Sequence, residues 1–481
     1  METGNYLFLK AGLLFLLMTG CSGLDDGYST NPAMRLTFSV DTLSFDTVFT
    51  TVGSATRSFM VYNTNREALN IETISLDNAP ATGFRFNVDG RSGGLFSGIR
   101  IAAGDSMYVF VEVTVDPNEK NRPLLIEDHL SFTLSGATQK LLLQAYGQDV
   151  HLYKGGFAIE RDTLFTAERP YLVYDSIVIR GGVTLSIEKG ATFYMHDKAK
   201  WIVEGAVKAA GTLDEPIVFR GDRLDYLLPD VPYDRIANQW DGLYFGAGSF
   251  GNEMSHVVVR NGYAGLSFRE SDGGESKLKI YGSQVTNMEQ SVLTAAGCRI
   301  EAVNTEFSNA TGHIASLSGG DYHFIHCTFA NYYIIRPGRS GSPVLNLKNY
   351  IQEAGNSVKS APLNAVFDNC LIDGSFSEGK EPLRGELSVD QSEKDGEMLS
   401  LRFNYCAVKT METEDARFIH TRFINKDNAP AYKSLGNADN GFSFDFRPDT
   451  AKVIIGAADP AIAAQYPLDR LGVSRVGGDG P

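Results

Sequence analysis

Charged and aromatic side chains that can bind a sugar or a calcium ion gather between positions 220 and 241. The members are Arg220, Asp222, Arg223, Asp225, Tyr226, Asp230, Tyr233, Asp234, Arg235, Trp240 and Asp241. Carboxylate oxygens are the ligands that Ca²⁺ prefers, and aromatic rings offer a flat apolar face to a sugar. Ion pairs on exposed loops usually contribute little to stability. Three roles therefore stay open for this cluster: catalysis, contact with a ligand or partner, and structural pairing.

Seven of these residues form the candidate ligand- or partner-binding loop. They are Arg220, Asp222, Arg223, Asp225, Asp234, Trp240 and Asp241. The stretch 224–238 interrupts the alternation of apolar and polar residues, which predicts a loop leaving one corner of the fold. Trp240 also stands in the phrase QWDGLYF, where packing against a strand is the alternative to stacking on a sugar.

A short repeated phrase indicates the element that must position this loop. It reads HVVVRN at 256–261, GSQVTN at 282–287, NTEFSN at 304–309 and HCTFAN at 326–331, with weaker copies NCLIDG at 369–374 and YCAVKT at 405–410. The step is about 22 residues, too short for a strand and a helix. The pattern predicts a right-handed parallel β-helix.

Alternation within the phrase separates an inward face from an outward one. The fourth residues are predicted to stack inward from coil to coil; they are Val259, Val285, Phe307, Phe329, Ile372 and Val408. The second residues are a column of small core side chains: Val257, Ser283, Thr305, Cys327, Cys370 and Cys406. The closing residues are predicted to turn the corner and to stack their amides in a ladder; they are Asn261, Asn287, Asn309 and Asn331.

The cysteines of the repeat zone are predicted to be reduced core thiols. Cys298, Cys327, Cys370 and Cys406 lack the CxxC spacing of zinc or redox sites. Gaps of 43 and 36 residues between the last three predict that more than one coil separates them. His323 and His326 are three residues apart in a strand and face opposite sides, so no shared metal is expected; His256 and His326 are expected to be hydrogen-bonded turn residues.

The N-terminus reads as a targeting segment. An apolar run at 11–18 is too short to span a bilayer and is followed by Thr19, Gly20 and Cys21. Met-Thr-Gly-Cys resembles a bacterial lipoprotein box, which implies cleavage after residue 20, acylation of Cys21 and a lipidated tether over 21–35. The alternative is an ordinary secretory signal with an incidental Cys21. Asp25 and Asp26 resemble the surface-export signal of Bacteroidota lipoproteins.

Residues 36–150 predict an immunoglobulin-like β-sandwich of seven or eight short antiparallel strands. Its predicted core includes Phe59, Val61, Tyr108, Phe110 and Val113. The phrases FDTVFTTVGSATRSFMVYN, FRFNVDG and YGQD resemble the N-terminal module of Bacteroidota lipoproteins that carry a right-handed, pectin-lyase-like β-helix. DEPIVFRGDR and the QWDGLYF region resemble the helix of that family, which implies an all-β chain with the β-helix at 151–450 and a C-terminal cap or tail at 451–481.

Composition and motifs favour binding over catalysis. The net charge of −15 argues against a nucleic-acid partner, and no phosphate loop, dinucleotide fingerprint or HExxH is present. The leading hypothesis is a non-catalytic protein, lipid-anchored in the outer membrane at the cell surface, whose β-helix binds an envelope protein, such as a β-barrel machine, or a glycan. The alternatives are a polysaccharide lyase or hydrolase acting on acidic glycans, and an adhesin. No cofactor or metal is expected, apart from Ca²⁺ under the lyase alternative.

Overall fold

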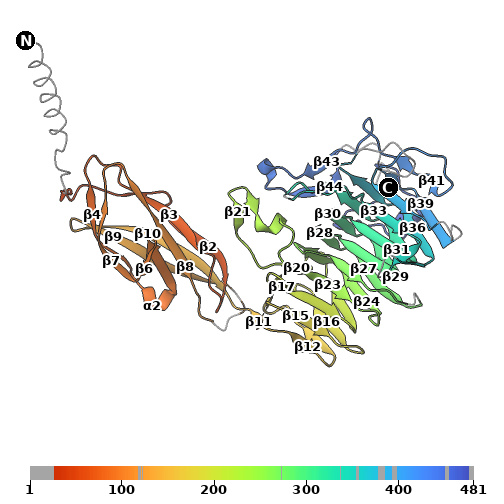
Figure 1. Cartoon of the computed structure of the whole chain (residues 1–481), viewed down its shortest axis with the longest axis horizontal. Coiled ribbons are helices and arrows are strands. Elements are labelled where there is room, and N and C mark those ends of the chain that lie inside the picture. Colours follow the sequence, from red (N-terminus) through yellow and green to blue (C-terminus); the bar gives the residue numbers. More distant parts are fainter. Residues whose placement is uncertain are drawn as a thin grey trace, which may run out of the picture. The chain divides into compact units, whose positions relative to one another are not determined.

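The computed structural model describes residues 27–117, 121, 123–271, 274–335, 337–353, 357–376, 385–392, 398–449 and 454–475 (Figure 1). The chain divides into two compact units, Met1–Asp149 and Val150–Pro481. In the described part, the regular secondary structure of both units is almost all β-strand, and no helix is long and apolar enough to cross a membrane. Cys21 and the lipoprotein box lie outside the described residues.

The first unit is a sandwich of two five-stranded sheets. One sheet has the order β1 (Thr37–Phe38), β3 (Arg57–Tyr62), β8 (Ser106–Val113), β5 (Phe84–Val88), β6 (Arg91–Gly93). The other has the order β2 (Thr42–Phe49), β10 (Ala137–Gln148), β9 (Leu124–Leu134), β4 (Leu69–Leu76), β7 (Leu95–Ile101), and a single helical turn, α2 (Ala79–Thr82), follows β4. The expectation of antiparallel strands throughout is wrong at one pair, because β2 and β10 run parallel.

The predicted core of the sandwich is right for three residues and wrong for two. Phe59, Val61 and Val113 are buried. Tyr108 and Phe110 are 49% and 37% exposed, because β8 places its odd-numbered residues inward and its even-numbered residues outward. Large aromatic side chains thus lie on the outer face of this sheet.

The second unit is a parallel β-helix, as predicted, and right-handed in keeping with the handedness of parallel crossovers. Each full coil contributes one strand to an eleven-stranded sheet and two strands to a seventeen-stranded sheet, which bends into two arms. The eleven-stranded sheet has the order β11 (His151–Tyr153), β14 (Tyr171–Val173), β17 (Thr192–Met195), β20 (Ile217–Gly221), β25 (Val257–Arg260), β28 (Gln284–Met288), β30 (Glu306–Ala310), β32 (Thr328–Asn331), β37 (Leu371–Gly374), β40 (Ala407–Val408), β42 (Arg422–Phe423).

The two arms of the larger sheet form the other two faces of the coil. The first arm comprises β12 (Phe157–Ile159), β15 (Ser176–Ile179), β18 (Lys200–Val203), β23 (Gly242–Phe245), β26 (Leu266–Phe268), the first halves of β29 (Leu293–Val303) and β31 (Ala315–Ile325), β33 (Leu345–Lys348) and β38 (Leu387–Asp390). The second arm comprises β13 (Thr163–Phe165), β16 (Thr184–Glu188), β19 (Ala206–Ala210), β24 (Asn252–Ser255), β27 (Ser276–Tyr281), the second halves of β29 and β31, β36 (Leu363–Asp368), β39 (Leu399–Asn404) and β41 (Phe418–Ile419).

The predicted inward column is confirmed. Each fourth residue of the repeated phrase pairs with its counterpart in the next coil, in the order Val259, Val285, Phe307, Phe329, Ile372, Val408. All six side chains are completely buried. The rings of Phe307 and Phe329 stack with their centroids 5.3 Å apart, so the core is a set of continuous ladders along the helix axis.

The thiol column is also buried, but the predicted spacing of its cysteines is wrong. Because Phe329 pairs with Ile372 and Ile372 with Val408, Cys327, Cys370 and Cys406 lie in successive coils. The first gap is long because it includes a hairpin, β34 (Tyr350–Gln352) with β35 (Val358–Ser360), inserted between the strands of a single coil. Burial, together with the neighbouring thiols, raises the pKa of Cys370 well above its usual value.

Two corners of the coil use left-handed backbone. At the end of the phrase, Asn261, Asn287 and Asn309 have positive φ, whereas Asn331 does not. The Asn331 amide donates to the carbonyl oxygens of Ala310 and Gly312. At the start of the phrase every residue has positive φ: His256, Gly282, Asn304, His326, Asn369 and Tyr405. The two histidines are hydrogen-bonded turn residues, as predicted, with Ser255 and Asn369 as their partners.

Segments of the chain itself cover the outer face of the eleven-stranded sheet. The segment 222–239 includes β21 (Tyr226–Leu228), β22 (Val231–Pro232) and the 3₁₀ turn η1 (Tyr233–Arg235). It meets the loop residues 332–335, where Ala237 N donates to Tyr333 Oη at 3.0 Å. The hairpin β43 (Tyr432–Leu435) and β44 (Phe444–Pro448) packs Tyr432 and Phe446 on outward residues of β32, β37 and β40. The tail 454–475 with α3 (Pro460–Gln465) reaches the same sheet through Arg470 and Glu306, 2.6 Å apart.

Candidate functional site

The structure divides the predicted binding loop into separate groups. Arg220 and Arg260 occupy consecutive outward positions of the eleven-stranded sheet, and both contact Asp234 Oδ1, at 3.1 and 2.8 Å. Burial lowers the pKa of Arg220, while Asp234 opposes that effect. Because Asp234 comes from η1, this ion-paired group holds the segment 222–239 against the sheet.

Asp222 belongs to a second group on the corner that follows the eleven-stranded sheet. Its Oδ2 lies 2.6 Å from His196 Nδ1, and the His196 ring stacks on Tyr174 with centroids 4.2 Å apart. Burial raises the pKa of Asp222, and the bond to His196 partly offsets the increase. Tyr174, His196 and Asp222 follow β14, β17 and β20, so they stack on one corner of three successive coils.

Arg223, Asp225 and Trp240 have structural partners. Both oxygens of Asp225 accept hydrogen bonds from Arg223, at 2.7 and 2.6 Å, and the guanidinium lies 4.0 Å from the centroid of the Tyr233 ring. The Trp240 ring is buried, and its Nε1 donates to the Arg260 carbonyl at 2.8 Å. Trp240 therefore packs in the coil and cannot serve as a platform for a sugar.

Asp241, the last residue of the predicted loop, lines a pocket of about 250 Å³ on the first arm. Its carboxylate lies 3.1 Å from Lys200 Nζ and accepts a hydrogen bond of 2.6 Å from Tyr244 Oη. Burial and the adjacent carboxylate raise the pKa of Tyr244 well above its usual value. The phenol is thus a neutral hydrogen-bond donor at physiological pH.

Glu204 and Arg269 complete this pocket from neighbouring coils. A Cβ at Gly246 would lie 1.9 Å from Glu204 Oε2, so a larger residue there would displace that carboxylate from its present position. Arg269 is exposed and follows β26. We call Lys200, Glu204, Asp241, Tyr244 and Arg269 the first-arm pocket. It combines two carboxylates, two cations and a phenol, so it offers both hydrogen-bond donors and acceptors.

Small polar side chains continue from this pocket along the outer face of the first arm. They pair coil by coil in the order Tyr244, Ser267, Thr294, Ser316, Asn346, Ser388. The Asn346 amide donates to Ser316 Oγ at 3.2 Å. Neighbouring strands are about 4.8 Å apart, so this polar column presents one uncharged hydroxyl or amide at each such step.

A groove of about 770 Å³ lies where the seventeen-stranded sheet bends between its arms. Glu270 and Lys359 form an ion pair at this groove, and Asn364 donates to Asp321 at 2.8 Å. Gly320 allows the bend, because its φ is +105° and a Cβ would lie 2.4 Å from the Cys298 carbonyl oxygen. Among the described residues no group of three His, Cys, Asp or Glu side chains is placed to hold a metal ion.

Sequence reasoning identified Asp241 but missed its partners. Lys200, Glu204 and Arg269 come from other coils, and only the register of the arms brings them to Asp241. Tyr244 could have been found, because Leu243, Tyr244 and Phe245 alternate inward, outward and inward after Asp241. No repeated sequence motif marks the polar column. Each of its residues stands alone in a strand whose recognisable pattern comes from its inward apolar residues.

No family model matches this chain, and no curated protein matches it. Solved structures with local likeness include a family 123 glycoside hydrolase from Clostridium perfringens, with 8% identity over 24% of this chain, 26% of that chain and a TM-score of 0.18. The catalytic domain of a GH87 α-1,3-glucanase in complex with tetrasaccharides has 9% identity over 79% of this chain and 90% of that one, with a TM-score of 0.26. The Agl-KA catalytic domain has 9% identity over 83% and 85%, with a TM-score of 0.24. At such TM-scores these likenesses carry no argument about function, and the fold assignment rests on strand order and register.

Proposed function

We propose that the first arm of the β-helix binds a glycan chain without cleaving it. The observation that carries this proposal is the continuity between the first-arm pocket and the polar column, which together offer hydrogen-bonding groups over seven coils. A glycan presents many hydroxyls that both donate and accept hydrogen bonds. A row of fixed donors and acceptors satisfies them without the entropy cost of ordering long side chains.

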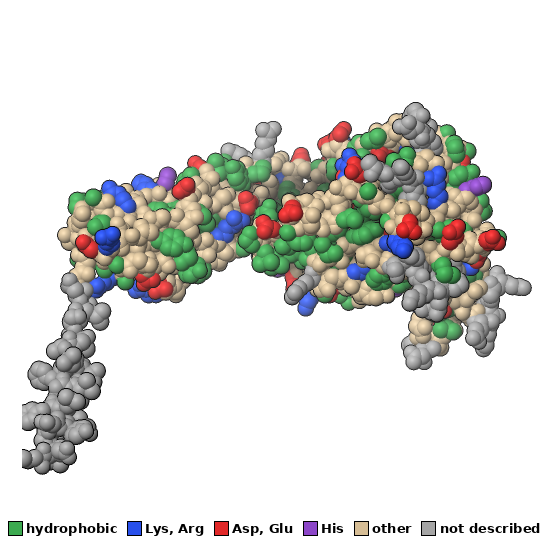
Figure 2. Space-filling model, turned by 90° about the horizontal axis from the view of Figure 1, so that it is seen from above, with side chains coloured by type: hydrophobic (Ala, Val, Ile, Leu, Met, Phe, Trp, Pro, Cys, Tyr) green, Lys and Arg blue, Asp and Glu red, His purple; other side chains and the backbone are tan. Residues whose placement is uncertain are grey.

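The charge pattern supports a glycan that is not strongly anionic. Lys200 is already paired with Asp241, and the column beyond the pocket is uncharged. On the face that Figure 2 shows, acidic and basic side chains are scattered among one another, with no broad basic area that would attract a polyanion. The eleven-stranded sheet is a poorer candidate, since segments of the chain itself cover its outer face.

We further propose that Cys21 carries a lipid anchor and that the protein lies in the outer membrane, exposed at the cell surface. The lipoprotein box at 18–21 supports this proposal. Anchoring would keep the rigid first arm at the envelope, where glycans of the cell or its surroundings are the ligands at hand. An envelope protein that binds the same face is the competing partner.

Binding of the full mature chain to a glycan array, followed by calorimetry with the best oligosaccharide, tests this function. We expect Asp241→Asn and Thr294→Val to weaken binding by about tenfold each, equivalent to about 1.4 kcal/mol. Thr184→Val, on the second arm, is the matched control and should leave the affinity unchanged. Absence of binding across the array, or equal effects of the two threonine substitutions, would show that the first arm is not a glycan site.

Glycan cleavage is the second candidate, because Glu204 and Asp241 place two carboxylates in one pocket. Most glycoside hydrolases use two carboxyl groups. One acts as a general acid and the other as a general base or nucleophile. Release of reducing ends from the bound oligosaccharide, abolished in both Glu204→Gln and Asp241→Asn, would establish hydrolysis. Unchanged oligosaccharide after long incubation with the wild-type chain would support binding alone.

A further inference from the structure

The outer face of the sandwich sheet β1-β3-β8-β5-β6 carries an exposed aromatic pair. Tyr108 and Phe110 point outward from β8, and their rings stack with centroids 5.8 Å apart and planes inclined by 22°. Adjacent large aromatic side chains exposed on a protein surface often mark a site that binds a ligand or another protein. The backbone alternation of β8 fixes both rings on the same side of a rigid sheet.

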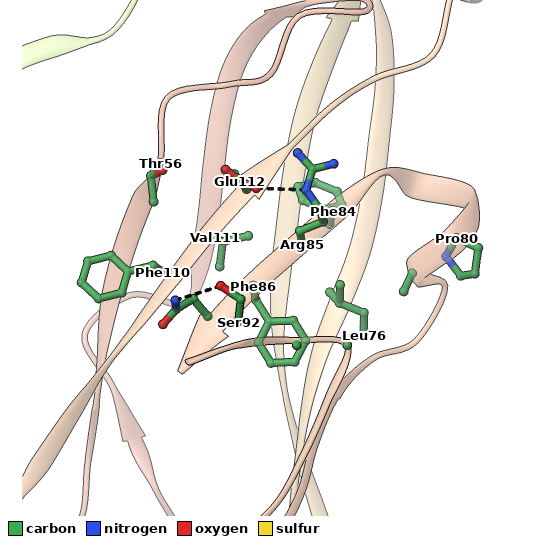
Figure 3. A pocket seen from close by; sticks show the side chains of 14 residues that line it. Thr56, Leu76, Pro80, Phe84, Arg85, Phe86, Ser92, Phe110, Val111 and Glu112 are labelled. Atoms are coloured by element: carbon green, nitrogen blue, oxygen red, sulfur yellow. Dashed lines mark hydrogen bonds and ion pairs between the residues drawn. The ribbon is translucent and has the colours of Figure 1, made fainter. Parts of the chain in front are cut away.

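A cavity of about 730 Å³ adjoins this pair and has Phe110 in its wall (Figure 3). Phe84, Phe86, Leu76 and Pro80 supply further apolar wall. The volume lies within the range of about 300–1,000 Å³ that is usual for sites of small ligands. Phe110 belongs to both the aromatic pair and the cavity wall, next to Arg85, Asn87 and Glu112 on the outer face, whereas Phe84 and Phe86 are buried residues of the inner face of the same sheet.

Polar groups are set into this apolar surface at defined places. The Asn87 amide donates to Ser92 Oγ at 3.2 Å, and Asn87 lies directly opposite Phe110 on the paired strands. Asn87 Oδ1 has no hydrogen-bond partner within the described part of the chain. Arg85 Nε donates to Glu112 Oε1 at 2.9 Å at the same opening (Figure 3).

We propose that this aromatic pair and cavity bind a pyranose sugar, as a second site separate from the first arm. A pyranose ring has an apolar face of C–H groups, which packs on an aromatic ring, and a rim of hydroxyls, which needs donors and acceptors. Phe110 and Tyr108 supply the rings, while Asn87, Arg85 and Glu112 supply the polar rim. A fatty acyl chain would offer no hydrogen-bond donor to Asn87 Oδ1, whereas a sugar hydroxyl would.

The side chains involved explain why the site can be tested without unfolding the sandwich. Tyr108 and Phe110 face away from the core, whereas Met107, Val109 and Val111 of the same strand fill it. Tyr146 is a matched control, because it is similarly exposed, at 42%, and lies on β10 in the other sheet. Substitution of any of the three rings leaves the apolar core in place.

The experiment uses the full chain and tetrasaccharides of β-linked glucose, galactose and N-acetylglucosamine, with binding followed by saturation-transfer NMR and calorimetry. We expect at least one tetrasaccharide to bind, and Tyr108→Ala, Phe110→Ala and Asn87→Ala to weaken it by about tenfold, equivalent to about 1.4 kcal/mol. Tyr146→Ala should bind as the wild type does, and thermal unfolding should stay unchanged in all four variants.

Three outcomes would overturn the proposal. The first is that no tetrasaccharide binds. The second is that binding is lost in Asp241→Asn and kept in Tyr108→Ala and Phe110→Ala, which would leave the first arm as the only glycan site. The third is that the aromatic substitutions abolish capture of a folded protein from envelope extracts and spare sugar binding, which would make this face a protein interface. Loss of sugar binding in the Tyr108 and Phe110 variants with Asp241→Asn unaffected would support the second site even if the proposal for the first arm failed.

Discussion

Replacing Glu386 by glutamine will destabilise the loop around Arg339, which follows β32 of the eleven-stranded sheet. Glu386 and Arg339 form a buried ion pair, with side chains 0% and 4% exposed. The carboxylate accepts hydrogen bonds from Arg339 Nη1 at 2.7 Å, from Arg339 Nη2, and from the backbone N–H of Phe376 and Val344 at 2.9 and 3.2 Å. Gly374 packs against this pair, since a Cβ there would lie 2.3 Å from Glu386 Oε1.

The expected cost follows from these contacts. Glutamine keeps one oxygen and replaces the other with an amide donor, so two of the four donors lose their acceptor. Each buried donor left unsatisfied costs about 1–3 kcal/mol, and removing one partner of a buried ion pair costs about 3–5 kcal/mol. We therefore expect Glu386→Gln to cost about 3–5 kcal/mol. Glu270→Gln, in the exposed pair with Lys359, should leave stability nearly unchanged, because solvent screens such a pair.

Hydrogen exchange measured by mass spectrometry is the appropriate assay, because stacked coils can open locally without unfolding the whole chain. Peptides containing Val344 and Phe376 should lose protection in Glu386→Gln, while peptides from the sandwich should not. The double variant Arg339→Met with Glu386→Leu should not recover protection, because the backbone N–H groups of Val344 and Phe376 would still lack an acceptor. Equal exchange in Glu386→Gln and Glu270→Gln would refute the reasoning.

Other predictions follow from the core, a buried histidine and the anchor. Phe307→Ala should cost about 3–5 kcal/mol, measured by urea unfolding, because its ring is buried in the column between Val285 and Phe329. Burial lowers the pKa of His326 from its ordinary 6.5 to about 4. The unfolded chain therefore binds this proton more readily, and stability should fall as pH drops from about 6.5 to about 4, a slope that His326→Asn should reduce. Cys21→Ser should move the protein from the detergent phase to the aqueous phase in Triton X-114 partition, if Cys21 carries the anchor.

The repeated phrase predicted the β-helix because it contained the physical rule of the fold. Val259, Val285, Phe307 and Phe329 recur at one position of an alternating strand, and such a column has one stable location, the core. The sandwich was harder to predict in detail. In β8 the sequence alternates Tyr108, Val109 and Phe110, all apolar, so hydrophobicity could not reveal which residues face inward.

The candidate site was only partly predictable, because distance along the chain did not indicate distance in space. Asp222 and Asp241 stand close in sequence, yet Asp222 pairs with His196 on one corner and Asp241 with Lys200 on the first arm. The spacing of Cys327, Cys370 and Cys406 misled for the same reason, since long insertions leave a coil and return to it. The partners of Asp222 and Asp241 and the stacking of the cysteines both depend on the register between successive coils. That register cannot be read from the sequence at isolated polar positions.

Comparison of the three faces of the β-helix supports the first arm as the place for a ligand. In the described part of the chain, outward residues of the eleven-stranded sheet pack against covering segments or form ion pairs with them. The second arm carries a column of alternating charge, Lys208, Glu253, Lys279 and Glu301, whose members neutralise one another from coil to coil. The first arm instead carries small hydroxyls and an amide at fixed intervals, exposed at Thr294 and half-buried at the other positions. Groups spaced in this way can bond to the hydroxyls of a chain laid along the helix axis, which is why we propose this face, rather than the other two, as the glycan site.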